Sequence, residues 1–156
     1  SIRRQRQMCI RDSFNTNIIE IKHNQLTRDN VIDELISKLE ENHYITSFDK
    51  VKKAILDREA ESTTAIGMNV AIPHGKSDAV KQPAVAVLQN KEGVEWESLD
   101  GSKPQIIFMI VVPNSSNNIH LKLLQRLSRT LMDDNTRNQL INAKDKDEIY
   151  NILKEI

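Results

Sequence analysis

Residues 58 to 77 read REAESTTAIGMNVAIPHGKS, and the rest of the chain is arranged around them. Val70–Ile72 is apolar and rich in β-branched residues, which predicts a short buried strand. Pro73 has no N–H to donate and is expected to end that strand, which places His74 at a strand end. Gly75–Ser77 then leaves room for a bulky reactant and adds a cation and a hydroxyl. A neutral imidazole there is a competent nucleophile, and a polar turn histidine without a function is the alternative.

The helix predicted before this stretch carries an arginine on its apolar face. Thr46 is expected to cap the helix, with Asp49 three residues later. Arg58 follows Ile55 by three residues and shares its face, where a core helix would carry leucine. Two interpretations stay open: a packed stem with its charged head in water, or a guanidinium that binds phosphate through two hydrogen bonds.

A second histidine is expected at the start of a later helix. Gln105–Val112 is the longest apolar run and predicts a central strand, which Pro113 closes. The next helix carries a stripe of leucines, and His120 shares their face in the first turn. Free N–H groups and the helix dipole favour an anion at this end. A hydrogen-bonded core histidine is the alternative reading of His120. The stripe consists of Leu123, Leu124, Leu127 and Leu131.

The order of the remaining elements sets the fold class. Strands are predicted at 17–21, 84–88 and 93–96, and helices at 29–42, 135–142 and 146–156. Strands that alternate with helices predict an α/β fold, a three-layer α/β/α sandwich with a mixed β-sheet flanked by helices. The chain of 156 residues fits one domain, at residues 14–156. Residues 1–13 form a basic tail, interpreted as a linker or a cloning remnant.

Charge and composition exclude several classes of function. The totals are 22 basic and 22 acidic residues, and without the four arginines and one aspartate of residues 1–13 the body is mildly acidic. That body lacks a basic stripe with aromatics, so nucleic acid is not expected as a partner. No apolar run reaches the roughly 20 residues that cross a bilayer, and we expect a cytoplasmic protein that does not insert into the membrane. Cys9 is the single cysteine, no spacing is typical of metal ligands, and no cofactor is implied.

The pattern around His74 resembles a known phosphorylation-site signature. Glu59 is followed by six residues, then Ile66–Gly67, two more residues and Val70–Gly75. This order is similar to that of the type-2 enzyme IIA domains, the fructose/mannitol family of the phosphoenolpyruvate-dependent sugar phosphotransferase system (PTS). The resemblance extends from roughly Phe14 to Ile156.

The resemblance implies a phosphocarrier with three site residues. His74 would be the phosphorylated nucleophile, Arg58 would stabilise the phosphate and His120 would assist by hydrogen bonding. Such donors suit phosphoryl transfer, whose transition state spreads charge over the non-bridging oxygens. The implied donor is HPr, and the implied acceptor is a cysteine of enzyme IIB, possibly encoded in one polypeptide with IIC. Enzyme IIB then phosphorylates fructose or a related sugar during uptake.

Other functions remain open on the sequence alone. A regulatory IIA-like domain, of the nitrogen-type PTS or of a transcription regulator, would use the same chemistry at His74 as a signal. A pure interaction module would not need His74. A nucleotide-binding P-loop at Gly75–Ser77 would require a glycine where Val70 stands, which argues against ATP or GTP. Cys9 lies in the tail, so the chain is expected to be a IIA unit only, and Trp96–Gly101 is most similar to fructose-type domains.

Overall fold

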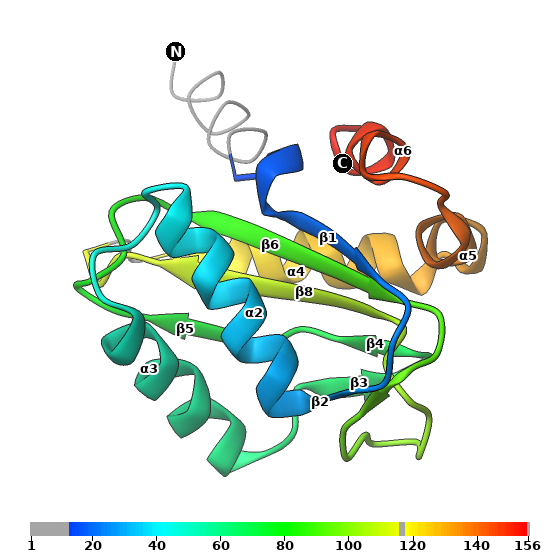
Figure 1. Cartoon of the computed structure of the whole chain (residues 1–156), viewed down its shortest axis with the longest axis horizontal. Coiled ribbons are helices and arrows are strands. Elements are labelled where there is room, and N and C mark those ends of the chain that lie inside the picture. Colours follow the sequence, from blue (N-terminus) through cyan, green and yellow to red (C-terminus); the bar gives the residue numbers. More distant parts are fainter. Residues whose placement is uncertain (1–12, 116–117, 156) are drawn as a thin grey trace.

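A six-stranded mixed sheet forms the middle layer of the fold (Figure 1). The structure is a computed structural model that describes residues 13–115 and 118–155. Five strands follow the order β1-β6-β8-β4-β3, and β5 also pairs with β8. Their bounds are β1 Ile19–Lys22, β3 Ala65–Gly67, β4 Val70–Ala71, β5 His74–Lys76, β6 Ala84–Asn90 and β8 Ile106–Val112. A separate parallel pair joins β2 (Leu26–Thr27) to β7 (Val94–Glu95).

The two long central strands, β6 and β8, are buried along their whole length. They pair antiparallel from Ala84 opposite Val111 to Gln89 opposite Ile106. The remaining ladders with β6 and β8 are parallel, with β1 on β6 and with β4 and β5 on β8. Continuous apolar runs suit strands that are covered on both faces. The predicted central strand is therefore confirmed.

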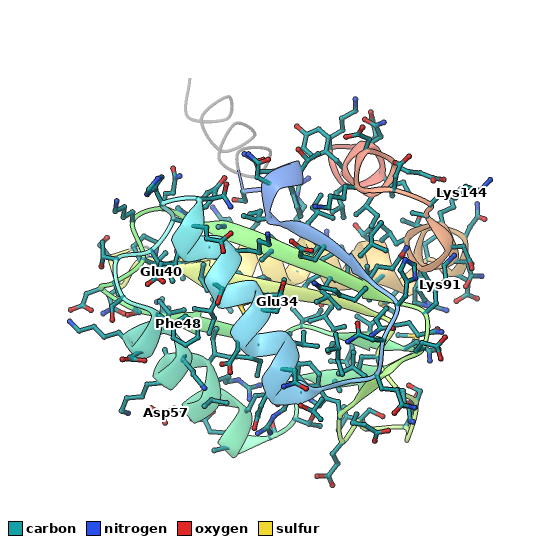
Figure 2. All side chains as sticks on the ribbon, in the orientation of Figure 1. Glu34, Glu40, Phe48, Asp57, Lys91 and Lys144 are labelled. Atoms are coloured by element: carbon teal, nitrogen blue, oxygen red, sulfur yellow. The ribbon has the colours of Figure 1, made fainter. Side chains whose placement is uncertain are left out.

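Helices cover both faces of the sheet (Figure 1). One face carries α2 (Arg28–Glu41) and α3 (Phe48–Glu61), which lie in front of the sheet in Figure 1. The other side carries α4 (Ile119–Met132), α5 (Asp134–Asn142) and α6 (Lys146–Leu153), and the 3-10 turn η1 (Thr16–Ile18) precedes β1. Figure 2 shows Glu34 and Glu40 on α2 and Asp57 on α3, the charged outer surface of the front layer.

Alternate residues of β8 supply two separate cores. Ile107, Met109 and Val111 pack with α2 and α3, whereas Phe108 and Ile110 pack with α4, α5 and α6. This division follows from the two-residue period of a strand. The predicted three-layer α/β/α sandwich is confirmed.

The ends of α2 show how local sequence places the elements. Thr27 and Asn30 form a reciprocal capping box, because each side chain accepts the other's backbone N–H. At the other end His43 adopts a φ of 65°. His43 N–H then donates to Glu40 O and Tyr44 N–H to Leu39 O, the pattern of a Schellman motif. The helix predicted over 29–42 is confirmed to within a residue.

Some predicted details of these elements are wrong. Ser47, not Thr46, caps α3, and its Oγ accepts from Lys50 N at 3.3 Å. Thr46 Oγ1 instead lies 3.3 Å from Ala79 O, to which it donates. The strand predicted at 17–21 begins as the η1 turn, so only Ile19–Lys22 is extended. The cap predicted at Asp145 is confirmed, since its Oδ1 accepts from Glu148 N at 2.8 Å.

None of the helices within the described residues is both long and apolar enough to span a bilayer. In the same part of the chain, no three His, Cys, Asp or Glu side chains gather into a group that could hold a metal ion.

Candidate active site around His74

His74 opens a strand. The predicted strand Val70–Ile72 is one residue shorter in the structure, where β4 ends at Ala71. Pro73 follows without a donor, but its carbonyl accepts from Ile110 N at 2.9 Å. Pairing with β8 then resumes in β5, with His74 opposite Ile110. His74 therefore lies at a strand end, as predicted, but at the start of β5. The prediction that Pro73 ends the pairing is wrong, because Pro73 lacks only a donor and its carbonyl keeps the chain attached to β8.

One nitrogen of the His74 ring is hydrogen-bonded, and the other has no partner among the described residues. Nδ1 lies 2.9 Å from the carbonyl oxygen of Ile72. A carbonyl can only accept, so Nδ1 carries the proton in this contact. The neutral ring then has its lone pair on Nε2, which has no hydrogen-bond partner among the described side chains and backbone groups. The ring is half-buried, so its position is defined while Nε2 can still be reached.

Gly75 accommodates a neighbouring helix. A Cβ on Gly75 would lie 3.2 Å from Ile55 Cγ1 and 3.3 Å from Ala54 Cβ, both on α3. The missing side chain therefore lets β5 lie close against α3. We predicted that Gly75 opens His74 to a bulky reactant, and the space is instead taken by the protein itself.

The two residues after Gly75 differ in role. Lys76 is exposed, so its ammonium group faces solvent. Ser77 is buried, and its Oγ accepts from Ala79 N at 3.1 Å while its own N–H donates to Val112 O. The predicted hydroxyl is therefore committed to the turn that ends β5.

Arg58 lies on α3, the helix that contacts β5. It is half-buried, and Nη1 donates to Ser62 O at 3.1 Å and contacts Ser62 Oγ at 3.4 Å. The first contact satisfies the carbonyl of Ser62, the C-cap residue of α3, which is one of the ordinary uses of an arginine at a helix end. Its Nε and Nη2 have no partner among the described residues, so part of the guanidinium remains available to an anion.

Glu59, rather than Arg58, occupies the fully inward position of the last turn of α3. The buried residues of this helix are Val51, Ile55 and Glu59, spaced four apart. Glu59 is only 7% exposed, and its carboxylate accepts from Thr64 N at 3.3 Å and from Thr64 Oγ1. In the sequence, Glu59 is marked only as the first residue of the signature. Its four-residue spacing from Ile55 is the signal that could have placed it inside.

His120 is the second residue of α4. Its side chain lies outside the described part of the chain, so its contact with the His74 site stays a prediction. Leu123, Leu127 and Leu131 of the same helix are buried against the sheet, as predicted, while Leu124 is half-buried. Since β5 and β8 are parallel, they end side by side, and α4 begins after the loop that leaves β8.

A comparison with known families decides the class of protein. Residues 12–156 match the family described as "Phosphoenolpyruvate-dependent sugar phosphotransferase system, EIIA 2". The chain belongs to this type-2 EIIA family. It is thereby a phosphotransferase component that carries a phosphoryl group.

Relatives of this EIIA domain include both fused and separate proteins. It is 38% identical over 148 residues to the PTS fructose-specific EIIABC component of Bacillus subtilis (strain 168), covering 95% of this chain but 23% of that protein. It is 32% identical over 139 residues to the PTS fructose-specific EIIA component of Haloferax volcanii, covering 89% and 90% of the two chains. The chain thus spans about a quarter of the fused relative and nearly all of the separate one.

A solved structure shares the fold of this EIIA domain. The nitrogen regulatory protein IIA-Ntr of Neisseria meningitidis superposes with a TM-score of 0.84 at 26% identity, covering 92% of this chain and 98% of that one. The nitrogen regulatory protein therefore shares the mixed sheet between two helical layers.

Proposed function

We propose that this EIIA domain accepts a phosphoryl group from phospho-HPr on Nε2 of His74 and passes it to a cysteine of enzyme IIB. The transfer would serve the uptake and phosphorylation of fructose or a related sugar. Fructose-specific relatives support this substrate class. The reaction would take place in the cytoplasm, where phosphoenolpyruvate is available as the source of the phosphoryl group.

The main support for this proposal is the hydrogen bond that His74 Nδ1 donates to Ile72 O. It keeps the proton on Nδ1 and the lone pair on Nε2, so the neutral ring can attack phosphorus without first losing a proton. A bond forms from Nε2 to phosphorus as the bond from phosphorus to the donor breaks, and the donor keeps that electron pair. In the second step the thiolate sulfur of the IIB cysteine attacks phosphorus, and the electron pair returns to Nε2.

The neighbouring groups would stabilise the transferred phosphoryl group. Arg58 offers Nε and Nη2 as charge-assisted donors from α3, the helix beside β5. His120 would supply a further donor from the first turn of α4, where the dipole favours negative charge. Donors held in place before the reaction are the main means of lowering a phosphoryl-transfer barrier.

The fused relative supports an acceptor close at hand. Its name joins EIIA with EIIB and EIIC in one component, which suggests that IIB and IIC can belong to the same polypeptide as this domain. The principal rival is a regulatory role, and the likeness to the nitrogen regulatory protein of Neisseria meningitidis favours it as a second candidate. Both roles share phosphorylation of His74 and differ in the acceptor.

Transfer to enzyme IIB separates the two roles. The domain is phosphorylated with phosphoenolpyruvate, enzyme I and HPr, freed of them and mixed with a fructose-type IIB domain. We expect the phosphoryl group to leave this chain and to appear on the IIB cysteine, and a IIB variant with serine at that position to receive none. A phosphorylated domain that retains its phosphoryl group beside several active IIB domains would refute the transport role and favour the regulatory one.

A further inference from the structure

Glu59 is a buried carboxylate without a cationic partner. It is 7% exposed, and no ion pair joins it to a basic side chain that the structure describes. Burial of a carboxylate is costly unless hydrogen bonds replace its water. Those hydrogen bonds come from one residue, Thr64, through its backbone N–H and its hydroxyl. A leucine would fill the same helix position without that cost. What the carboxylate adds is two oxygens that accept hydrogen bonds from Thr64.

Thr64, which Glu59 holds, in turn binds the backbone just before His74. It is 3% exposed and directly precedes β3. Its carbonyl accepts from Ile72 N at 3.0 Å. Glu59 therefore fixes both the side chain and the amide of the residue that holds Ile72.

The carbonyl of Ile72 is held from both sides. Ile72 N is bound by Thr64 O, and the carbonyl of the next residue, Pro73, accepts from Ile110 N at 2.9 Å. The planar peptide bond between Ile72 and Pro73 then leaves the Ile72 carbonyl little freedom to turn. This is the oxygen that lies 2.9 Å from Nδ1 of His74.

We propose that Glu59 is a positioning residue for phosphoryl transfer, which holds His74 in the tautomer with a free Nε2 through Thr64 and the Ile72 carbonyl. The inference rests on the proposed phosphorylation of His74 and adds to it the group that sets the ring. Glu59 itself does not touch the phosphoryl group. Its role is to accept hydrogen bonds, so an uncharged acceptor of the same length serves in its place.

Four variants test this role. Glu59→Ala removes both acceptor oxygens, and Thr64→Val removes the hydroxyl while keeping the shape. Glu59→Gln keeps one oxygen to accept from Thr64 N, and its amide N–H can donate to the Thr64 hydroxyl, which is able to accept. Val51→Ala is the matched control, because Val51 is 1% exposed in the same stripe of α3 and lies two turns before Glu59. Each folded variant is compared for melting temperature, rate of phosphorylation by phospho-HPr and the imidazole ¹⁵N spectrum of His74.

We expect Glu59→Ala to lower the phosphorylation rate by about 10- to 100-fold, the range in which misplacement of a reacting group acts. Its His74 spectrum should show loss of the single Nδ1–H tautomer. Thr64→Val should shift both in the same direction, Glu59→Gln should stay within about threefold of the wild-type rate, and Val51→Ala should do so despite a lower melting temperature.

Three results would overturn the positioning role. One is a wild-type rate and His74 spectrum in Glu59→Ala. Another is a rate loss in Val51→Ala equal to that in Glu59→Ala at a similar melting temperature, which makes the effect one of stability. The third is Glu59→Gln as slow as Glu59→Ala, which assigns the effect to charge. Failure of the wild-type chain to accept a phosphoryl group would instead refute the proposed function, and the positioning role with it.

Discussion

Replacing Gly75 by alanine tests the close contact between β5 and α3. The new Cβ would lie 3.2 Å from Ile55 Cγ1 and 3.3 Å from Ala54 Cβ, closer than ordinary van der Waals contact. Gly75 has no positive φ, so the backbone accepts alanine and the cost is one of packing. Overpacking of a core costs roughly 1–3 kcal/mol, and the lower entropy of the unfolded chain returns about 0.4–1 kcal/mol.

The expected net loss of stability in Gly75→Ala is about 1 kcal/mol, which corresponds to a fall in melting temperature of roughly 2–4 °C for a chain of this size. Urea unfolding followed by circular dichroism measures the free energy, and a thermal scan measures the midpoint. Because His74 is the neighbouring residue, we also expect a reduced rate of phosphorylation.

A second substitution identifies the contact responsible. Ile55→Ala alone should cost about 2–5 kcal/mol, because Ile55 is fully buried. The Cβ of Gly75→Ala fills part of that space in the double variant, so the two losses should sum to more than the loss of the double variant by at least about 0.5 kcal/mol. Additive losses, or a Gly75→Ala protein as stable as the wild type, would refute the packing argument.

Two further predictions concern charge. Arg58→Gln should slow phosphorylation by about 10- to 100-fold, because the phosphoryl group loses a charged donor. The free energy of unfolding should change by less than about 1 kcal/mol. An unchanged rate in a stopped-flow or quench assay would contradict this. Asp100 is held by the Ser102 hydroxyl, by Met68 N and by Ser102 N, which keeps the pKa of its carboxyl well below the ordinary value. A folded pKa below the unfolded one stabilises the chain above about pH 4, and this contribution is lost as the pH falls below it. Asp100→Asn should therefore show a shallower loss of stability between about pH 5 and pH 3 than the wild type in urea titrations; equal slopes would contradict this.

The sequence could predict the elements whose signals are local. The helical spacing of α2 and the apolar runs of β6 and β8 dictate those elements and, through their alternation, the three layers. The signature also identifies His74 as the candidate nucleophile, because it lies between Pro73 and Gly75.

The sequence alone could not predict details that depend on contacts between residues far apart in the chain. Thr46 and Ser47 are adjacent hydroxyl residues that can both cap a helix, and the contact of Thr46 with Ala79 leaves Ser47 as the cap. The short strands β3 and β5 exist through pairing with β4 and β8, not through an apolar pattern of their own.

Tertiary contacts also decide which of Arg58 and Glu59 takes the inward position in the last turn of α3. Both lie within reach of the Ile55 face, at spacings of three and four residues. Two donors on Thr64 make the inward position favourable for a carboxylate, and the half-buried Arg58 donates to Ser62 at the helix end. Only the path of the chain after α3 decides this.

The most direct measurement is the intact mass of the protein after incubation with phosphoenolpyruvate, enzyme I and HPr, for the wild type and for His74→Ala. We predict a gain of one phosphoryl group in the wild type, stable in base and labile in acid, as expected for a phosphohistidine, and no gain in a folded His74→Ala protein. An unmodified wild type beside phosphorylated HPr, or a His74→Ala protein that gains the same mass, would contradict the assignment of His74 as the phosphoryl acceptor.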